Sequence, residues 1–332
     1  MTFQLICDYR ENFMNYSNLN PNNMYNDHPS KKNIKEIMDA IKSLGFDCNY
    51  FGGIPELIHA IDTKEKCEDC IFLNFTDGMD EQYSRVQAPA LLEILNVPYS
   101  GSGVFPSALM NNKHFCKKAL LKLGIHMPQS YIVNHDLSVN CSIIKEWRFP
   151  LFVKPNCEGS SLGISKDCIC HTIDEVLYKC SKLLENFEEI IIEEFVDGID
   201  ITNYLIGNNN SYYVNSIIVA ELFDHSPYAI YGINEKQNKL RTLFLDNEYL
   251  PMDLIKKIKN ESILIAQTIG VHDICRIDYR VNLANKDINF IEINSAPRFS
   301  STSEIGFIAY KNNIPFSRMV QYYLTTVLER LT

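Results

Sequence analysis

The first hundred residues alternate between short apolar runs and segments with helical periodicity. Apolar runs predict strands at residues 5–7, 48–51 and 71–75. Helices are predicted for the segments between and after these strands, at residues 30–44, from Pro55 and over 83–95. These segments either repeat apolar residues at steps of three and four or begin with a residue that favours the start of a helix. An alternation of this kind predicts a parallel sheet covered by helices, and therefore an α/β fold.

Length and charge limit what the chain can do. At roughly 150 residues per domain, 332 residues suggest about two domains. The formal net charge of −10 argues against a broad nucleic-acid surface or a basic membrane patch, so we expect neither partner. No apolar run approaches the ~20 residues of a membrane span. The first apolar run follows no basic segment, so we interpret it as a strand and not a signal peptide, and we expect a cytoplasmic protein.

Eleven cysteines are scattered through strand-like and helix-like stretches. An odd number without regular spacing does not predict a disulfide framework. The Cys67–Cys70 pair stands alone, whereas a zinc site needs a second pair or two suitably spaced histidines. We therefore expect reduced, structural cysteines.

The strongest local signal is an apolar strand that ends in a lysine and a glycine- and serine-rich loop. Lys154 belongs to the strand, and the loop follows over residues 156–163. Backbone N–H groups and hydroxyls in such a loop can surround phosphate oxygens. It is not a P-loop, because the lysine precedes the glycines. The alternative is a hairpin with a surface lysine.

Two further segments carry acidic residues on predicted strands. Glu292 and Asn294 are two residues apart, so they share a face of their strand, and Ile291 and Ile293 face a core. If Asp278 lies on the neighbouring strand, the three oxygen ligands suit Mg²⁺; the alternative is a solvated sheet face. The segment 190–200 is an apolar strand that runs into acidic residues and a turn. Its backbone groups are able to bind a purine and a carboxylate is able to bind a ribose, although an edge strand that ends in a turn explains the same pattern equally well.

The order of these features resembles a known family. Lys113, the Lys154 strand with its loop, the 190–200 segment, and then the strands with Asp278 and Glu292 follow one another as in ATP-grasp enzymes. Within that superfamily the chain is most similar to the D-alanine–D-alanine ligases and their relatives, from about residue 70 to the end. The resemblance implies an N-terminal Rossmann-like domain followed by two α+β subdomains that enclose an ATP cleft. We place these three domains at residues 1–104, 105–189 and 190–332.

The resemblance also implies a role for particular residues. The groups expected to bind the nucleotide through its phosphates, adenine and ribose are Lys113, Lys154, the loop residues Glu158, Gly159, Ser160, Ser161 and Gly163, then Glu193, Phe195, Val196 and Asp200. The expected ligands of two Mg²⁺ ions, which Mn²⁺ is able to replace, are Asp278, Glu292 and Asn294. The expected catalytic residues are Arg276, which stabilises developing negative charge, and Ser160, which orders the substrate loop.

These roles imply a two-step reaction. A carboxylate attacks the γ-phosphate of ATP and forms an acyl phosphate, and an amine then attacks the acyl carbon. The oxyanion that develops needs cationic or N–H stabilisation. Phosphoryl transfer mainly needs positioning and charge neutralisation, which lysines, metals and a glycine-rich lid supply.

Several positions depart from the family's pattern and bear on the substrate. The glutamate that holds the first amino acid's ammonium is missing after the first strand, where Asp8 and Glu11 are the possible substitutes. Arg298 replaces a glycine. Ser303 stands where the family serine binds the acceptor's carboxylate, but Glu304 follows it in place of an apolar residue. The candidates for the family's Tyr–Lys pair in a mobile loop are Tyr228, Tyr231, Lys236 and Lys239.

We therefore predict an ATP-dependent carboxylate–amine ligase that forms a peptide bond. The donor is expected to be a small amino acid, and the altered residues beside the acceptor predict an acceptor other than D-alanine or a larger one. The alternatives are the same chemistry on a specialised metabolite or peptide, and a nucleotide-binding module without catalysis. A homodimer is also compatible with the resemblance.

Overall fold

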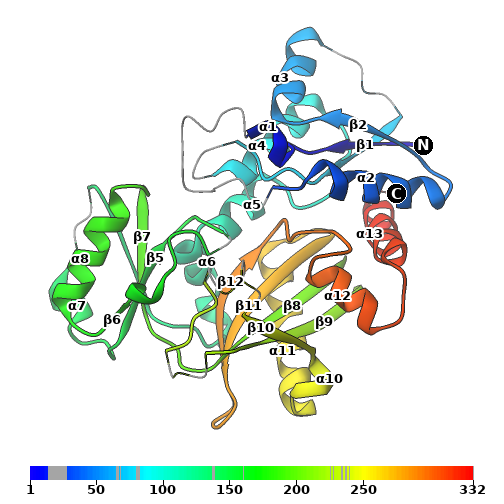
Figure 1. Cartoon of the computed structure of the whole chain (residues 1–332). Helices are drawn as coiled ribbons and strands as arrows, with labels where there is room; N and C mark the ends of the chain where they lie inside the picture. The colour runs from blue at the N-terminus through cyan, green and yellow to red at the C-terminus, as the bar shows by residue number, and fades with distance from the viewer. Residues whose placement is uncertain are drawn as a thin grey trace.

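The structure contains three sheets with helices around them (Figure 1). It is a computed structural model, and it describes residues 1–331 apart from 14–27, 65, 66, 68, 80–82, 137, 138, 160, 225, 227, 233, 234, 236, 237 and 239.

The N-terminal sheet is parallel, as the alternation predicts. Strand β1 (Thr2–Ile6) lies between β2 (Asp47–Gly52) and β3 (Cys70–Asn74). Its helices are α2 (Lys31–Ser43), α3 (Ile54–Thr63) and α4 (Ser84–Leu95), with the four-residue α1 (Arg10–Phe13) in a segment where the sequence predicted no helix. Helix α2 begins at Ser30, whose hydroxyl oxygen accepts from the backbone N–H of Asn33.

A break at Asn112 separates two helices in the segment that follows the N-terminal sheet. Helix α5 (Val104–Asn111) ends there, α6 (Lys113–Leu120) begins, and the short 3₁₀ helix η2 (Leu121–Leu123) follows. The Asn112 side chain accepts a hydrogen bond from the backbone N–H of Phe115, which caps α6. Lys113 is therefore the first residue of a new helix.

The second sheet is antiparallel, with the order β4-β7-β5-β6. Its strands are β4 (Ser130–Asn134), β5 (Leu151–Pro155), β6 (Ile169–Cys170) and β7 (Glu189–Glu194). Around them lie α7 (Cys141–Ile144), η3 (Lys166–Cys168) and α8 (Ile173–Leu184). Because β7 pairs with both β4 and β5, the boundary that we expected at 189/190 falls inside a strand of this sheet.

The third sheet carries most of the chain's second half and is also antiparallel, with the order β10-β9-β8-β11-β12. Its strands are β8 (Ile199–Asn208), β9 (Ser211–Leu222), β10 (Arg241–Leu245), β11 (Ile274–Asn282) and β12 (Asp287–Asn294). Helix α11 (Met252–Ile269) packs on one face, and α10 (Asp246–Tyr249), α12 (Glu304–Lys311) and α13 (Phe316–Leu331) complete the chain.

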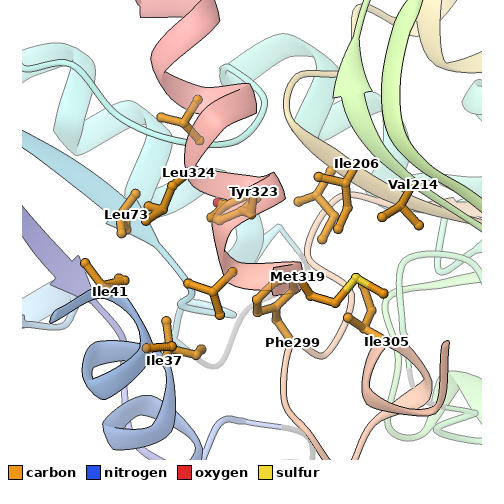
Figure 2. Close-up of a cluster of buried hydrophobic side chains, with 14 of the residues drawn as sticks. Ile37, Ile41, Leu73, Ile206, Val214, Phe299, Ile305, Met319, Tyr323 and Leu324 are labelled. Carbon is orange, nitrogen blue, oxygen red and sulfur yellow. The ribbon is translucent and has the colours of Figure 1, made fainter. Parts of the chain in front are cut away.

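Helix α13 joins the first and third sheets through one core. Figure 2 shows Met319, Tyr323 and Leu324 of this helix among buried apolar side chains from both sides. Ile37 of α2 lies on one side and Ile206 of β8 on the other. The last helix thus fixes the N-terminal sheet against the sheet that carries the acidic residues.

All eleven cysteines lie in the described part of the chain and none forms a disulfide there, which agrees with the expectation of reduced cysteines. None of the helices in the described part of the chain combines the length and the apolar composition that a membrane crossing requires.

Buried thiols lead to a prediction about alkaline stability. Burial raises the pKa of Cys180 on α8 from 9.0 to about 12. Above pH 9 the unfolded chain releases this proton while the folded chain retains it, so folding is weakened as the pH rises. Between pH 8 and 10.5 the wild type should lose about 2 kcal/mol more unfolding free energy than Cys180→Ala. Urea unfolding under reducing conditions measures this difference.

The matched control is Val176→Ala in the same core, because it also removes a buried side chain from α8 but no titratable group. It should lower the unfolding free energy equally at both pH values. Parallel losses in the wild type and Cys180→Ala would contradict the prediction.

Candidate active site

A cavity of about 170 Å³ lies between the second and third sheets; we call it the smaller cavity. Most residues that the sequence assigned to nucleotide, metal and catalysis line it: Lys113, Lys154, Glu158, Gly159, Ser161, Glu193, Phe195, Val196, Asp200, Arg276, Asp278 and Glu292. Gly163 is not part of the lining, and Ser160 lies outside the described residues.

The lysine-rich wall of the smaller cavity contains an ion-pair network. Lys154 Nζ lies 2.9 Å from one carboxylate oxygen of Glu193, and Lys117 contacts the other oxygen. Burial by itself raises the pKa of Glu193, but the two lysines bring it below its ordinary value. Burial lowers the pKa of Lys117 to about 8. Sequence reasoning missed Lys117, although it follows Lys113 by four residues and therefore shares its helix face.

The acidic wall is formed by β11 and β12, which pair so that Asp278 faces Glu292 directly. Asn294 donates from Nδ2 to Asp278 at 3.2 Å, so the three predicted metal ligands lie together. Two carboxylates and an amide oxygen form the hard oxygen set that Mg²⁺ prefers, with phosphate oxygens and water completing it. The residues therefore fit magnesium, although no group of three or more His, Cys, Asp or Glu side chains converges within the described residues.

Both carboxylates of this wall also have cationic neighbours. Arg276 Nη2 lies 2.7 Å from Asp278, and Lys113 Nζ lies 3.3 Å from Glu292. Burial by itself raises the pKa of Glu292, but Lys113, Lys154 and Arg276 hold it well below its usual range. Burial raises the pKa of Asp278 despite the opposing charge of Arg276. Glu292 is thus the more firmly ionised of the two facing carboxylates.

A β-bulge in β12 corrects the expected orientation of one side chain. We expected Ile291 to face a core with Ile293, but the pairing shifts between Asp278 and Tyr279, so that β12 carries one extra residue. Ile291 consequently lines the smaller cavity, while Ile293 is buried in the core against α11. An apolar side chain on the cavity wall suits the face of an aromatic base.

The rim of the smaller cavity contains a second residue that sequence reasoning missed. Arg280 Nη1 lies 3.0 Å from Asp200, the residue predicted to hold the ribose. It also donates from Nε to the carbonyl of Val196 at 3.2 Å, and its guanidinium lies 5.6 Å from the ring centroid of Phe195. Arg280 therefore fixes three of the groups expected to bind adenosine. Its position two residues after Asp278 on one strand is the signal that could have identified it.

The glycine-rich loop approaches the segment after β9. Ser161, with φ of 62°, donates from its hydroxyl to the carbonyl of Tyr231 at 2.9 Å. Lys113 donates to the carbonyl of Glu158 in the same loop. Gly163 has φ of 72°, and a Cβ there would lie 2.8 Å from Pro155, so only glycine fits this turn.

The four mobile-loop candidates separate into two groups. Tyr231 lines the smaller cavity, and Tyr228 is exposed with its ring 5.7 Å from that of Phe195. Lys236 and Lys239 lie outside the described residues.

A second cavity of about 780 Å³, the larger cavity, lies between the first and third sheets. Arg298, Ser303 and Glu304, the residues predicted to contact the amino acids, all line it, together with the predicted metal ligand Asn294. The Ser303 hydroxyl donates to the carbonyl of Ser300 at 2.8 Å, within the turn before α12.

The possible substitutes for the missing glutamate have other contacts. The Asp8 carboxylate accepts from the backbone N–H of Ile54 and from the hydroxyl of Thr76. The Glu11 carboxylate accepts from the backbone N–H of Lys31. Neither side chain is among the residues that line the larger cavity. Both carboxylates instead stabilise turns of the N-terminal unit.

Comparison with known proteins identifies the family. The family model described as the D-ala D-ala ligase C-terminus matches residues 124–325. The D-alanine–D-alanine ligase of Aquifex aeolicus is 30% identical over 71% of this chain and 75% of its own length. The chain belongs to the D-alanine–D-alanine ligase family. The enzyme of the same name from Halalkalibacterium halodurans is 25% identical over 89% of this chain and 93% of its own length.

Solved structures confirm the ATP-grasp fold. The D-alanine–D-alanine ligase from Bacillus anthracis, crystallised with ATP, superposes with a TM-score of 0.71 at 19% identity, covering 99% of this chain and 98% of that one. The VanG D-Ala:D-Ser ligase from Enterococcus faecalis gives 0.75 at 17% identity, covering 98% and 99%. The expected activity is also confirmed at the level of the family: the chain is an ATP-dependent ligase that forms a C–N bond. Ligases of this family use ATP and Mg²⁺.

Proposed function

We propose that this ligase joins two amino acids through an acyl phosphate, with a small amino acid as the donor. The observation that supports this most is the meeting of cationic and acidic residues in one cavity beside a second, larger one. D-Alanine is the first candidate for the donor, because it is the substrate named for the relatives. The volume of the larger cavity supports an acceptor larger than D-alanine.

In the first step the residues of the smaller cavity position ATP. Lys113 and Lys154 are proposed to contact its phosphates, and the loop over 158–163 to close over them. Asp278, Glu292 and Asn294 would hold Mg²⁺, which neutralises charge on the transferred phosphoryl group when it is bound. Glu193 holds the ammonium group of Lys154 at the cavity wall and that of Lys117 behind it, so these cations need little reorganisation when the nucleotide binds.

The adenosine would occupy the part of the smaller cavity near Arg280. Phe195 and Val196 are proposed to hold the base, and Asp200 the ribose, with Arg280 as their common anchor. Ile291 adds an apolar contact surface. The Glu193 carboxylate already accepts hydrogen bonds from two lysines, so its remaining lone pairs would accept the hydrogen bond from the adenine base.

In the second step an amine attacks the acyl carbon and the phosphate leaves. Arg276 lines both cavities and is therefore proposed to stabilise the oxyanion where they meet. The loop that includes Ser161 would exclude water from the acyl phosphate through its contact with the Tyr231 segment. Ser160 retains its predicted role in ordering the substrate loop, and Arg298 and Ser303 retain theirs in contacting the substrate.

The experiment is a product assay with purified protein, ATP, Mg²⁺ and a panel of D- and L-amino acids. We expect ADP release that depends on D-alanine or another small donor, and a product whose mass equals two amino acids less one water. Lys154→Ala should abolish release, because it removes a phosphate contact and leaves the buried Glu193 with one partner. ATP binding in calorimetry without ADP release across the panel would instead support a module without catalysis.

The division into three domains, the cytoplasmic location and the homodimer stay predictions. The sheets support the division, with the second boundary best placed after Glu194, the end of β7.

A further inference from the structure

Glu304 and Arg241 form a charged pair where the two cavities meet. Glu304 lines both the smaller and the larger cavity, and Arg241 lines the larger one. Tyr231 and Arg276 also line both, so these side chains surround the passage between the cavities. On the proposed function, on which this inference rests, the acyl phosphate forms on one side of the passage and the acceptor arrives from the other.

Residues of two strands of the third sheet, β8 and β10, and of helix α12 hold the pair in place. Glu304 is the first residue of α12, and Arg241 is the first residue of β10. Arg241 Nη2 lies 3.3 Å from Glu304 Oε1, and the buried hydroxyl of Tyr204 on β8 donates to Oε2. The guanidinium also stacks on Tyr231, 4.4 Å from the ring centroid. These contacts restrict the rotamers of both charged side chains, which reduces the entropy cost of binding a ligand.

The guanidinium of Arg241 retains a hydrogen-bond donor for a ligand. Arg241 Nη1 is buried and has no hydrogen-bond partner among the described residues. A guanidinium carries five N–H donors, and an ionised carboxylate has about four acceptor positions. A buried donor without a partner is costly, and a ligand oxygen would satisfy it.

An amino acid matches this pair in charge, because it presents an ammonium and a carboxylate a few ångströms apart. We propose that Glu304 and Arg241 together bind the acceptor amino acid, Glu304 through its amine and Arg241 through its carboxylate. This placement directs the amine toward the passage and Arg276.

The other charged groups of the larger cavity are less suited to this task. Asp77 is held by Arg85 at 3.1 Å, and Arg276 is held by Asp278 at 2.7 Å. Arg298, which stands at the family's usual glycine position, is exposed. Glu304 and Arg241 are the pair at the passage that combines both charges.

The test is a competition with three acceptor forms in one mixture. D-Alanine serves as donor, and D-alanine, D-lactate and D-alanine amide compete as acceptors at equal concentration. D-Lactate lacks the ammonium and D-alanine amide lacks the carboxylate. Mass spectrometry measures the three products as ratios, which do not depend on how much active enzyme each preparation contains.

We expect Glu304→Gln to lower the ratio of D-alanine to D-lactate product at least about tenfold, because the ammonium loses its ionic partner. Arg241→Gln should lower the ratio of D-alanine to D-alanine amide product by a similar factor. Glu304→Asp keeps the charge and should retain the wild-type preference. Lys311→Gln, at an exposed ion pair on the same helix, should leave both ratios unchanged.

Unchanged ratios in Glu304→Gln and Arg241→Gln, with product still formed, would overturn this proposal and leave the proposed function intact. Absence of ADP release in the wild type across the whole amino-acid panel would refute the proposed function itself. If the wild type prefers another acceptor of the panel, the same three forms of that compound are compared.

Discussion

Glu292→Gln is expected to lower kcat for ADP release at least about 100-fold, because it removes a proposed magnesium ligand and its charge. Loss of an outer contact to a metal ligand already costs 10- to 100-fold, so loss of the ligand itself should cost at least the upper value. The glutamine has nearly the same shape, so the pairing of β12 with β11 should survive. A coupled assay of ADP release, repeated over a range of Mg²⁺ concentrations, measures both kcat and the apparent metal affinity.

The surrounding charges explain why this carboxylate matters more than its neighbour. Lys113 lies 3.3 Å from Glu292 and keeps it ionised, whereas burial raises the pKa of the facing Asp278. A neutral glutamine would leave Lys113 without its ionic partner and the metal with one charge less. The matched control is Asp287→Asn at the exposed start of the same strand, which should retain wild-type kcat. A Glu292→Gln variant within threefold of the wild type would refute the assignment.

The order of elements and most of the residues that line the candidate site could be predicted from the sequence, because both depend on short-range patterns. Strand periodicity places Glu292 and Asn294 on one face, and the structure brings Asp278 opposite them. Helical steps of three and four residues predicted α2, including its capping residue Ser30. The joint order of the motifs indicated the family, which the comparisons confirm.

The remaining features depend on contacts between distant parts of the chain. The bulge that turns Ile291 toward the cavity arises from the register between two strands, which residue periodicity does not encode. The pairing of Lys117 with Glu193 joins a helix to a strand 76 residues away. Arg241 follows a segment without clear periodicity and meets Glu304 only in the folded chain. The sequence contains each of these residues, but it does not show which residue each of them contacts in the folded chain.

The acidic net charge of the chain is compatible with an anionic substrate because the cations are concentrated. Lys113, Lys154 and Arg276 all line the smaller cavity, and Lys117 lies behind them. Lys113 and Arg276 each pair with a carboxylate of their own, and Lys154 and Lys117 share that of Glu193. ATP with Mg²⁺ then adds charges of both signs to an already paired arrangement, which limits the electrostatic cost of binding.

Asp273→Ala is expected to lower the free energy of unfolding by about 3–5 kcal/mol, the cost of breaking a buried ion pair. Asp273 is fully buried, and both of its oxygens receive Arg330 of α13, at 2.8 and 2.7 Å. It also accepts from the backbone N–H of Gly101 at 2.8 Å and from Asn208 Nδ2 at 3.0 Å. One carboxylate thus links the last helix, the third sheet and the segment after α4. Urea unfolding followed by circular dichroism measures the loss.

Three further variants separate the ion pair from backbone effects. Asp273 has φ of 68°, which asparagine tolerates better than alanine, so Asp273→Asn removes the charge with less backbone strain. The matched control is Asp253→Ala in the exposed pair with Lys286, which should change the free energy of unfolding far less. Arg330→Leu should also destabilise the protein. The double variant should lose much less unfolding free energy than the sum of the two single losses, because each single change leaves a charge unpaired and the double change removes both charges. Additive losses, or a loss from Asp273→Ala no larger than from Asp253→Ala, would show that this network does not hold the N-terminal unit against the third sheet.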